Sequence, residues 1–366
     1  MPTRRIALFV SSFEAGGVQR VMINLANELT IQGYFVDMVA VTNKGPLVKT
    51  IETGVSIKNL NSTRVLFAIK KLIGYFKSEQ PNVFISGQTH LNAVSVIAHK
   101  IAGSNSKLIV VEHNHMSSVS KRGKSWVDKL RPFWAKMFYR FASQVVTVSE
   151  DVANDLSVLT GIDRGKIKVV YNPVLESRIF EQQHSPVSHP WFLDSAIPIA
   201  LGVGRLSAQK DFSSLIRAIA KVNETRPVRL VILGEGEERE KLDALVLELA
   251  LDQLVSIPGY VENPFAYMQK ADLFVLSSAW EGLPSVLIEA MACGTSVLST
   301  DCPAGPREIL EDGKYGNLVP VGDVDALAAG ILMSLANPRE PSELIMRARN
   351  FLSSEATNDY IALFDD

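Results

Sequence analysis

The chain has 366 residues, of which 47% are hydrophobic and 21% charged, and its formal net charge is −2. This length exceeds what one hydrophobic core usually serves, so we expect two domains. The composition excludes collagen-like, disulfide-scaffold and wholly disordered proteins. The longest apolar runs are the size of strands, below the roughly 18 residues of a membrane span. Two cysteines offer neither a disulfide framework nor a zinc-site spacing, so a reducing cytosol fits best.

The two halves of the chain differ in charge. Residues 1–190 hold 23 Lys and Arg against 13 Asp and Glu, whereas residues 191–366 hold 14 against 26. The basic half predicts an anionic partner, such as a membrane surface, a nucleic acid or a phosphorylated substrate. The alternative is that the two unlike halves attract each other.

The first half alternates strand-like and helix-like segments. Near-continuous apolar runs predict buried parallel strands at residues 6–10, 36–41, 82–86, 108–111 and 145–148. Apolar residues from Val18 to Leu29 recur at helical spacing, and Gly33 stands where that helix would stop. After an apolar run at 167–171, three prolines between residues 173 and 190 predict a linker.

The same rhythm restarts in the second half. Strands are predicted at residues 199–203, 229–233, 255–258, 273–276 and 296–299, with helices beginning near Asp211, Glu237, Pro264, Pro284 and Asp323. This alternation predicts parallel sheets covered by helices on both faces. Open sheets of this kind bind ligands outside the carboxyl ends of their strands, so two such domains predict a site in a cleft between those ends.

Two glycine motifs follow predicted strands. Gly16 and Gly17 come after the first strand, where backbone N–H groups could approach an anionic or sugar ligand at the positive end of a helix. Packing of a tight strand–helix turn explains this pair equally well. Gly202-Val-Gly204 resembles a dinucleotide fingerprint, but residue 207 is Ser rather than the third glycine, which argues against a Rossmann dehydrogenase.

Two cations follow the second of these motifs. Arg205 and Lys210 lie between a predicted strand end and a helix start, where we expect no packing role for them. A guanidinium fork together with an ammonium suits a diphosphate and could neutralise it without a metal ion. The alternative is a pair of solvated loop cations.

The segment from Trp280 to Gly294 carries the strongest local signal. Pro284 stands at a favourable first helical position, and the backbone amides of residues 283–286 would form an anion-binding helix end. Glu281 and Glu289 would lie about 12 Å apart along a helix. This exceeds the roughly 5–9.5 Å between the paired carboxylates of glycosidases. The spacing instead suits hydroxyl groups at opposite ends of one long ligand.

Four motifs together resemble the family 4 retaining glycosyltransferases of the GT-B fold. They are Gly16-Gly17, the Gly-Arg…Lys-Asp segment at 204–211, Leu233-Gly-Glu-Gly-Glu237 and the Glu-x7-Glu element at 281–289. Their order fits the family over nearly the whole chain. The segment 299–308 looks like the branch that builds bacterial polysaccharides and lipid-linked oligosaccharides.

The resemblance implies an α/β fold of two doubly wound Rossmann-like domains that face each other across a cleft. Residues 1–185 would form the acceptor-binding domain, completed by a C-terminal helix at 353–366. Residues 186–352 would form the nucleotide-sugar-binding domain. The implied reaction moves a hexose or N-acetylhexosamine from a nucleotide-sugar, UDP-linked by the habit of the family, with retention of anomeric configuration. No metal ion or other cofactor is expected.

The resemblance also implies roles for single residues. Arg205 and Lys210 would bind the diphosphate, Glu281 the hydroxyls of the donor sugar, and Glu289 the ribose. His113 matches the histidine that the family places near C6 of the sugar, and His115 competes for that role. Together with Arg205, Lys210 and Glu281, His113 completes the catalytic set. The other implied donor contacts are Gly16, Gly17, Gly282, Leu283, Pro284 and Ser285, although the family's usual Glu-Gly-Phe-Gly is here Glu-Gly-Leu-Pro.

Residues 121–141, which we call the basic aromatic segment, combine seven cations with six aromatic residues and one acid. This mixture is what an interfacial helix needs, and a second basic amphipathic stretch runs from residue 64 to 77. We expect a cytoplasmic protein bound peripherally to the anionic inner face of the cytoplasmic membrane, with a polyprenyl-diphosphate-linked saccharide as acceptor. The predicted contacts are Lys121, Arg122, Lys124, Trp126, Lys129, Arg131, Trp134, Lys136 and Arg140.

Several alternatives stay open at this stage. The aromatic residues of the basic aromatic segment could pack inward and leave only solvated cations. The mixture also fits single-stranded nucleic acid, but no nucleic-acid module accompanies it, so we expect no nucleic acid partner. For the whole protein, the rivals are a nucleotide-sugar epimerase of the same fold and a non-catalytic membrane scaffold that binds nucleotide-sugars.

Overall fold

The computed structural model describes residues 4–14, 16–122, 126–193 and 196–365, without the side chains of 126–128. The chain divides into two compact units, unit 1 with residues 1–174 and 353–366, and unit 2 with residues 175–352. The change of unit falls at Val174–Leu175 and not at residue 185, because helix α7 (Ser177–Gln182) packs on helices α10 (Phe265–Lys270) and α11 (Ser285–Ala292) of unit 2.

Unit 1 contains a parallel sheet with the strand order β3-β2-β1-β4-β5-β6-β7 among the described residues. The strands are β1 (Arg5–Val10), β2 (Phe35–Ala40), β3 (Val55–Asn59), β4 (Val83–Ser86), β5 (Lys107–Glu112), β6 (Gln144–Thr147) and β7 (Ile167–Val169). The predicted strands are confirmed to within two residues at each end. Strand β3 was not predicted, because this edge strand is mostly exposed and lacks an apolar run. Strand β7 was recognised only as an apolar run at residues 167–171.

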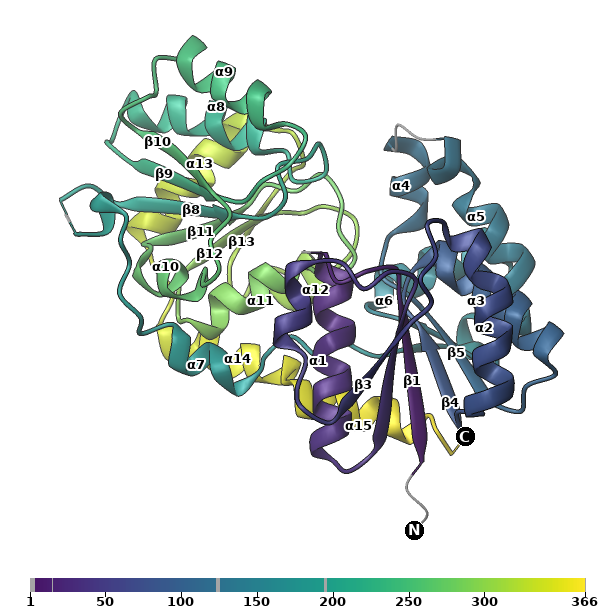
Figure 1. Ribbon diagram of the computed structural model, residues 1–366. Helices are drawn as coiled ribbons and strands as arrows, with labels where there is room; N and C mark the ends of the chain where they lie inside the picture. Colours follow the sequence, from purple (N-terminus) through teal and green to yellow (C-terminus); the bar gives the residue numbers. More distant parts are fainter. Residues whose placement is uncertain (1–3, 15, 123–125, 194–195, 366) are drawn as a thin grey trace. The chain divides into compact units, whose positions relative to one another are not determined.

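Helices cover both faces of the sheet of unit 1 (Figure 1). They are α1 (Gly17–Ile31), α2 (Val65–Glu79), α3 (Thr89–Ala102), α4 (Met116–Arg122), α5 (Trp126–Phe138), α6 (Glu150–Thr160) and α15 (Ser353–Ala362). Helix α3 packs between α2 and α5 on one side, whereas α15 packs on α1. The last helix thus returns to the first unit, where its Tyr360 is 1% exposed.

Unit 2 repeats this architecture with the strand order β10-β9-β8-β11-β12-β13 among the described residues. The strands are β8 (Ile199–Val203), β9 (Arg229–Leu233), β10 (Val255–Gly259), β11 (Leu273–Leu276), β12 (Val297–Thr300) and β13 (Asn317–Val319). Besides α7, α10 and α11, the helices are α8 (Phe212–Asn223), α9 (Arg239–Glu248), α12 (Pro306–Ile309), α13 (Val324–Ala336) and α14 (Pro341–Ala348). Strand β13 was missed because it has three residues.

Buried polar residues lie at the carboxyl ends of several strands. The middle of each sheet is fully buried and apolar, as in Leu8 and Phe9 of β1, which stabilises the sheet by about 25 cal/mol per Å² of apolar surface removed from water. Ser86 and Glu112 end β4 and β5, and Ser277 directly follows β11, all of them buried. In doubly wound sheets this edge is where ligands bind.

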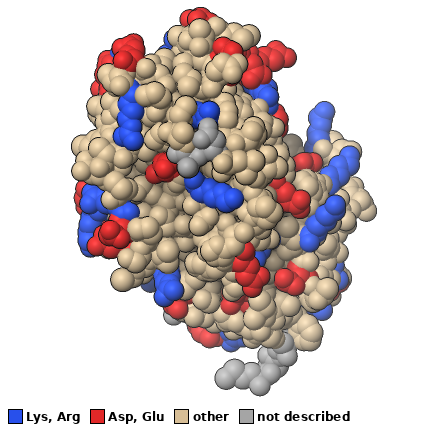
Figure 2. Space-filling model, turned by 90° about the vertical axis from the view of Figure 1, so that its left-hand side faces the viewer, with Lys and Arg blue, Asp and Glu red and all other residues tan. Residues whose placement is uncertain are grey.

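Two further properties bear on possible partners. Among the described residues, no helix is long and apolar enough to cross a membrane. Figure 2 shows a face of the molecule on which acidic and basic side chains are interspersed, without a broad field of one sign.

Candidate active site

The loop after β8 is held by the glycine motif that follows β9. A Cβ atom on Gly234 would lie 1.9 Å from the carbonyl oxygen of Gly204, so only glycine allows the two loops to touch. The amide of Gly204 donates to the carbonyl of Leu233 (3.0 Å), and the amide of Leu206 donates to that of Glu235 (2.9 Å). The Gly-Glu-Gly motif therefore fixes the loop that carries the two predicted phosphate-binding cations.

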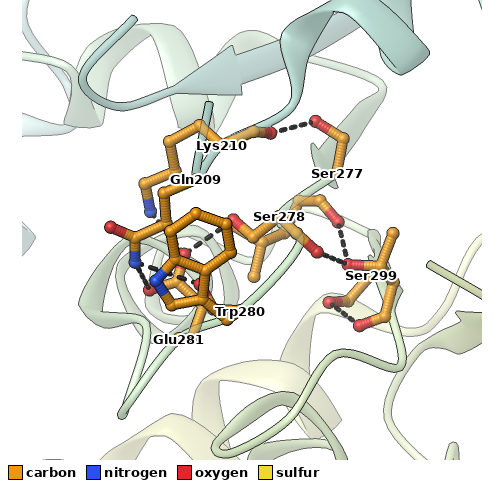
Figure 3. A network of polar contacts seen from close by, with 9 residues as sticks. Gln209, Lys210, Ser277, Ser278, Trp280, Glu281 and Ser299 are labelled. Atoms are coloured by element: carbon orange, nitrogen blue, oxygen red, sulfur yellow. Dashed lines mark hydrogen bonds and ion pairs between the residues drawn. The ribbon is translucent and has the colours of Figure 1, made fainter. Parts of the chain in front are cut away.

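The carboxylate of Glu281 lies at the centre of a polar network in unit 2 (Figure 3). Lys210 Nζ donates to Glu281 Oε1 at 2.7 Å, and Ser278 Oγ donates to the same oxygen at 2.6 Å. Gln209 Nε2 lies 3.4 Å from Glu281 Oε2 and donates to the carbonyl of Trp280 at 3.0 Å. The structure thus brings two predicted site residues, Lys210 and Glu281, into direct contact.

The two predicted cations, Arg205 and Lys210, differ in their surroundings. We expected no packing role for either side chain, and this expectation is wrong for Lys210. Its methylene stem lies so close to Gly204 that a Cβ atom there would be 2.9 Å from Lys210 Cε. Its backbone carbonyl accepts a hydrogen bond from Ser277 Oγ at 2.8 Å. Arg205, in contrast, is exposed, and the ion pairs formed by the described residues do not include it. Arg205 is therefore open to a ligand, whereas the Lys210 ammonium is already paired with Glu281.

The two glutamates of the Glu-x7-Glu element do not lie on one helix. Helix α11 begins at Ser285, with Pro284 as its N-cap residue rather than its first helical residue. Glu281 belongs to the preceding loop, so the estimate of 12 Å along a helix rests on a wrong premise. Glu289 does lie on the helix, where it is 3% exposed.

The segment after β12 holds the Glu281 loop in place. The amide of Glu281 donates to the carbonyl of Pro303 at 3.1 Å. A Cβ atom on Gly305, whose φ is +94°, would lie 2.4 Å from Pro284 Cδ and 3.0 Å from the carbonyl oxygen of Gly282. Leu283 is buried beside them. Ser278 is tied to the same strand, because Thr300 Oγ1 donates to its carbonyl at 2.6 Å.

Gly16 and Gly17 lie at the N-terminus of α1, as predicted. The φ of Gly16 is −138°, which any residue adopts. A Cβ atom on Gly16 would meet only the flexible end of Gln19, and one on Gly17 would have no neighbour within 4 Å. Packing within the described part of unit 1 therefore does not require either glycine.

His113 follows β5 and is 8% exposed. Burial lowers the pKa of His113 to about 4, so its imidazole is neutral at physiological pH. Its Nε2 has no hydrogen-bond partner among the described residues. A Cβ atom on Gly87 would lie 3.2 Å from that nitrogen and 2.8 Å from Met22 Sδ. Asn172 is a further polar neighbour, whose hydrogen bonding partly opposes the lowering of the His113 pKa. The Nε2 atom keeps unused hydrogen-bonding capacity.

His115 has a structural role that His113 lacks. It precedes α4, and its Nδ1 accepts from the amide of Ser118 at 3.3 Å and contacts Ser118 Oγ at 2.9 Å. Its Nε2 lies 3.7 Å from Asp155 Oδ1. Nδ1 therefore caps the N-terminus of α4, while Nε2 lies near Asp155 beyond hydrogen-bond distance. Of the two competing histidines, His113 is the better candidate for binding a ligand.

Sequence reasoning missed three residues that position the candidates. Ser278 and Gln209 hold Glu281, as described above. Glu112, which is 1% exposed, accepts from Tyr139 Oη (2.8 Å), from Thr89 Oγ1 and from the amide of Asn114. Burial raises the pKa of Glu112. This cluster ties the loop of His113 to its neighbouring helices, and its only signal in the sequence is an acid at the end of an apolar strand.

The basic aromatic segment presents a mixed outer surface. Phe133 and Trp134 are 52% and 39% exposed, whereas Ala135 and Tyr139 on the same segment are buried. The exposed predicted cations are Lys121, Arg122, Lys129, Lys136 and Arg140, while Arg131 is half-buried. Lys124 and the side chain of Trp126 lie outside the described residues. Inward packing thus accounts for Tyr139 but not for Phe133 or Trp134.

Helix α2 adds a second exposed apolar site to unit 1. Leu66 and Phe67 are 70% and 64% exposed, beside the exposed Lys70 and Lys71. This helix contains the second basic amphipathic stretch that the sequence indicated.

Comparisons with known proteins agree with these observations. Residues 15–178 match the model described as Glycosyltransferase Family 4, and residues 190–351 match the one described as Glycosyl transferases group 1. An uncharacterised glycosyltransferase of Methanocaldococcus jannaschii is 33% identical over 67% of this chain and 61% of its own length.

Two further proteins resemble this chain over most of its length. The first is the N-acetylgalactosamine-N,N'-diacetylbacillosaminyl-diphospho-undecaprenol 4-alpha-N-acetylgalactosaminyltransferase of Campylobacter jejuni, which is 26% identical over 92% of this chain and 91% of its own. The second is the Anabaena protein HepE, crystallised with UDP-glucose, which shares the fold with a TM-score of 0.81 at 18% identity over 99% of both chains.

Proposed function

This chain belongs to the family 4 glycosyltransferases of the GT-B fold, and we propose that it transfers a hexose or N-acetylhexosamine from a UDP-sugar to a lipid-diphosphate-linked saccharide. The proposal includes retention of anomeric configuration, independence of metal ions, and peripheral binding to the inner face of the cytoplasmic membrane. The observation that carries it is the fixed loop of unit 2 that places the Lys210 ammonium against Glu281.

The proposed binding of the nucleotide-sugar donor follows from the charged residues on that loop. A leaving nucleoside diphosphate develops negative charge, and preorganised cations stabilise this charge because they need not reorganise during the reaction. Arg205 and Lys210 are assigned to the diphosphate, Glu281 to the hydroxyls of the donor sugar, and Glu289 to the ribose. The UDP-glucose bound to HepE supports uridine as the base.

The reaction needs no covalent intermediate in this proposal. The acceptor hydroxyl attacks the anomeric carbon from the face of the leaving group, and a phosphate oxygen of that group receives the proton. His113 contributes a neutral imidazole whose Nε2 can bond to a sugar hydroxyl. Retention of configuration follows because both groups use one face of the sugar.

The proposed access to a lipid-linked acceptor is based on the surface of unit 1. The Campylobacter relative is named for an undecaprenyl-diphosphate-linked substrate, and such a lipid is confined to a membrane. Exposed Phe133 and Trp134 beside exposed cations give unit 1 the composition of an interfacial surface. Binding of this surface to anionic lipid would hold the enzyme where its acceptor is.

One assay tests the proposal against its two rivals. The protein is incubated with UDP- and GDP-sugars in EDTA, with and without a polyprenyl-diphosphate-linked saccharide, and released nucleotide and sugar products are measured. We expect release of UDP only when the acceptor is present, with an α-linked product from an α-linked donor. Free epimer without acceptor would identify an epimerase. Tight binding without turnover would identify a scaffold, and activity that requires added metal would contradict metal independence.

A further inference from the structure

A largely buried ion pair lies at the centre of the network in Figure 3. The side chains of Lys210 and Glu281 are 15% and 8% exposed, and their charged atoms are 2.7 Å apart. The same carboxylate oxygen of Glu281 accepts from Ser278 Oγ at 2.6 Å, and Ser278 is fully buried. Within this structure, therefore, Glu281 balances the charge of Lys210.

A donor diphosphate competes with Glu281 for Lys210. When the ammonium turns to the phosphates, Glu281 loses its counter-ion in a poorly solvated place and faces new negative charge. Both effects cost free energy, since an uncompensated buried charge and a like-charge neighbour are each unfavourable. Hydroxyl groups of the attached sugar can donate to the carboxylate and offset this cost. A nucleoside diphosphate without its sugar has no such donors at that position.

We propose that the Lys210–Glu281 pair makes the site prefer the intact nucleotide-sugar over the nucleoside diphosphate that remains after transfer. Glu281 is then a specificity-determining residue. Its unpaired carboxylate weakens binding of the nucleoside diphosphate, whereas the sugar hydroxyls of the intact donor form hydrogen bonds to it. Re-formation of the pair after transfer favours release of the nucleotide. This inference rests on the proposed function, because it takes the diphosphate to bind at Lys210.

Ser278 has a separate part in the same arrangement. Its hydroxyl shares Glu281 Oε1 with Lys210, and it stays bonded when the ammonium moves away. Ser278 is itself fixed, since Thr300 Oγ1 donates to its carbonyl at 2.6 Å. It is therefore a positioning residue that keeps Glu281 directed at the sugar, and its removal alters geometry without altering charge.

Calorimetry measures two affinities for the wild type, Glu281→Gln and Ser278→Ala. The first is for UDP, and the second is for UDP-N-acetylglucosamine or UDP-glucose, whichever of the two the wild type binds. We expect Glu281→Gln to bind UDP about tenfold more tightly, because Lys210 no longer leaves a buried carboxylate. The preference for nucleotide-sugar over UDP falls accordingly. Ser278→Ala keeps both charges and removes a donor from Glu281, so we expect no tighter binding of UDP and a lower affinity for the nucleotide-sugar. Glu281→Ala gives the same direction for UDP should the Gln variant not fold.

The control is Asp325→Asn, which removes an exposed ion pair of the same unit, formed with Lys221, and leaves both affinities unchanged. The inference is overturned if both Glu281 variants bind UDP as tightly as the wild type or more weakly. In that case the proposed function still stands, provided that the wild type binds the nucleotide-sugar. Failure of the wild type to bind any of these nucleotides contradicts the proposed function itself, and the inference with it.

Discussion

The candidate residues Glu281 and His113 both follow the carboxyl end of a strand, β11 in unit 2 and β5 in unit 1, but their polar atoms are satisfied differently. In unit 2, the Glu281 carboxylate bonds to Lys210 and Ser278 within its own chain. In unit 1, His113 lies just past the carboxyl end of β5, yet its buried Nε2 bonds to none of the described residues. A ligand at Lys210 therefore competes with a partner already in place, whereas His113 Nε2 can bond to a ligand without giving up a hydrogen bond. The paired Glu281 favours selectivity between ligands, whereas the unpaired Nε2 of His113 favours binding of any ligand that can form a hydrogen bond with it.

The largest expected effect is on the cations of unit 2. Arg205→Ala and Lys210→Ala should each lower kcat/KM by about 10²–10³, because each removes a positive charge that stabilises the leaving diphosphate. The matched control is Arg217→Ala, an exposed cation of α8 outside the network, which should keep its activity. Steady-state kinetics with a confirmed donor decide the matter, together with thermal unfolding of each variant. Near wild-type turnover in both variants would remove these residues from the mechanism.

A smaller loss is expected at His113. His113→Ala removes one buried hydrogen bond to the substrate, which corresponds to a loss of about 10- to 100-fold in kcat/KM. His115→Asn keeps a side chain that can cap α4 and should retain most of the activity. If His115→Asn loses more activity than His113→Ala at equal stability, the assignment of the two histidines is reversed.

The lowered pKa of His113 also predicts a dependence of stability on pH. The folded imidazole stays neutral down to about pH 4, whereas the unfolded one binds a proton below its ordinary value of 6.5. Acidification between these values thus favours the unfolded state, by about 1–2 kcal/mol at pH 5. Denaturant unfolding at pH 7 and pH 5 should show that His113→Gln loses less stability than the wild type. Equal losses would show that His113 is not held neutral.

The smallest single effects are expected on the surface of unit 1. Each exposed cation of the basic aromatic segment contributes about 1 kcal/mol to binding an anionic leaflet, so Lys136→Ala or Arg140→Ala should weaken binding about fivefold. Trp134→Ala should weaken it further by removing an apolar contact. Co-sedimentation with vesicles of varied anionic lipid content measures this, with Lys241→Ala of α9, an exposed lysine of unit 2, as control. Binding that ignores the anionic fraction would contradict the proposed membrane contact.

The sequence predicted the central strands and the order of the motifs because both are local. Apolar runs such as residues 199–203 specify a buried strand wherever they occur, whereas β3 and β13 are short or exposed and depend on their neighbours for pairing. The contact of Lys210 with Glu281 joins loops 71 residues apart, and no spacing rule contains it. The same holds for Glu112 and Tyr139, whose pairing depends on how the following helix packs.

The proposed roles of Lys210 and Glu281 depend most on where Lys210 lies when the donor is bound. A crystal structure with an intact UDP-sugar, grown in EDTA, measures this directly. We predict that Lys210 Nζ is within hydrogen-bond distance of the diphosphate, that Arg205 contacts it too, and that Glu281 accepts from a sugar hydroxyl while still bonded to Ser278. A bound nucleotide with Lys210 still paired to Glu281, or with its diphosphate away from both cations, would contradict the account.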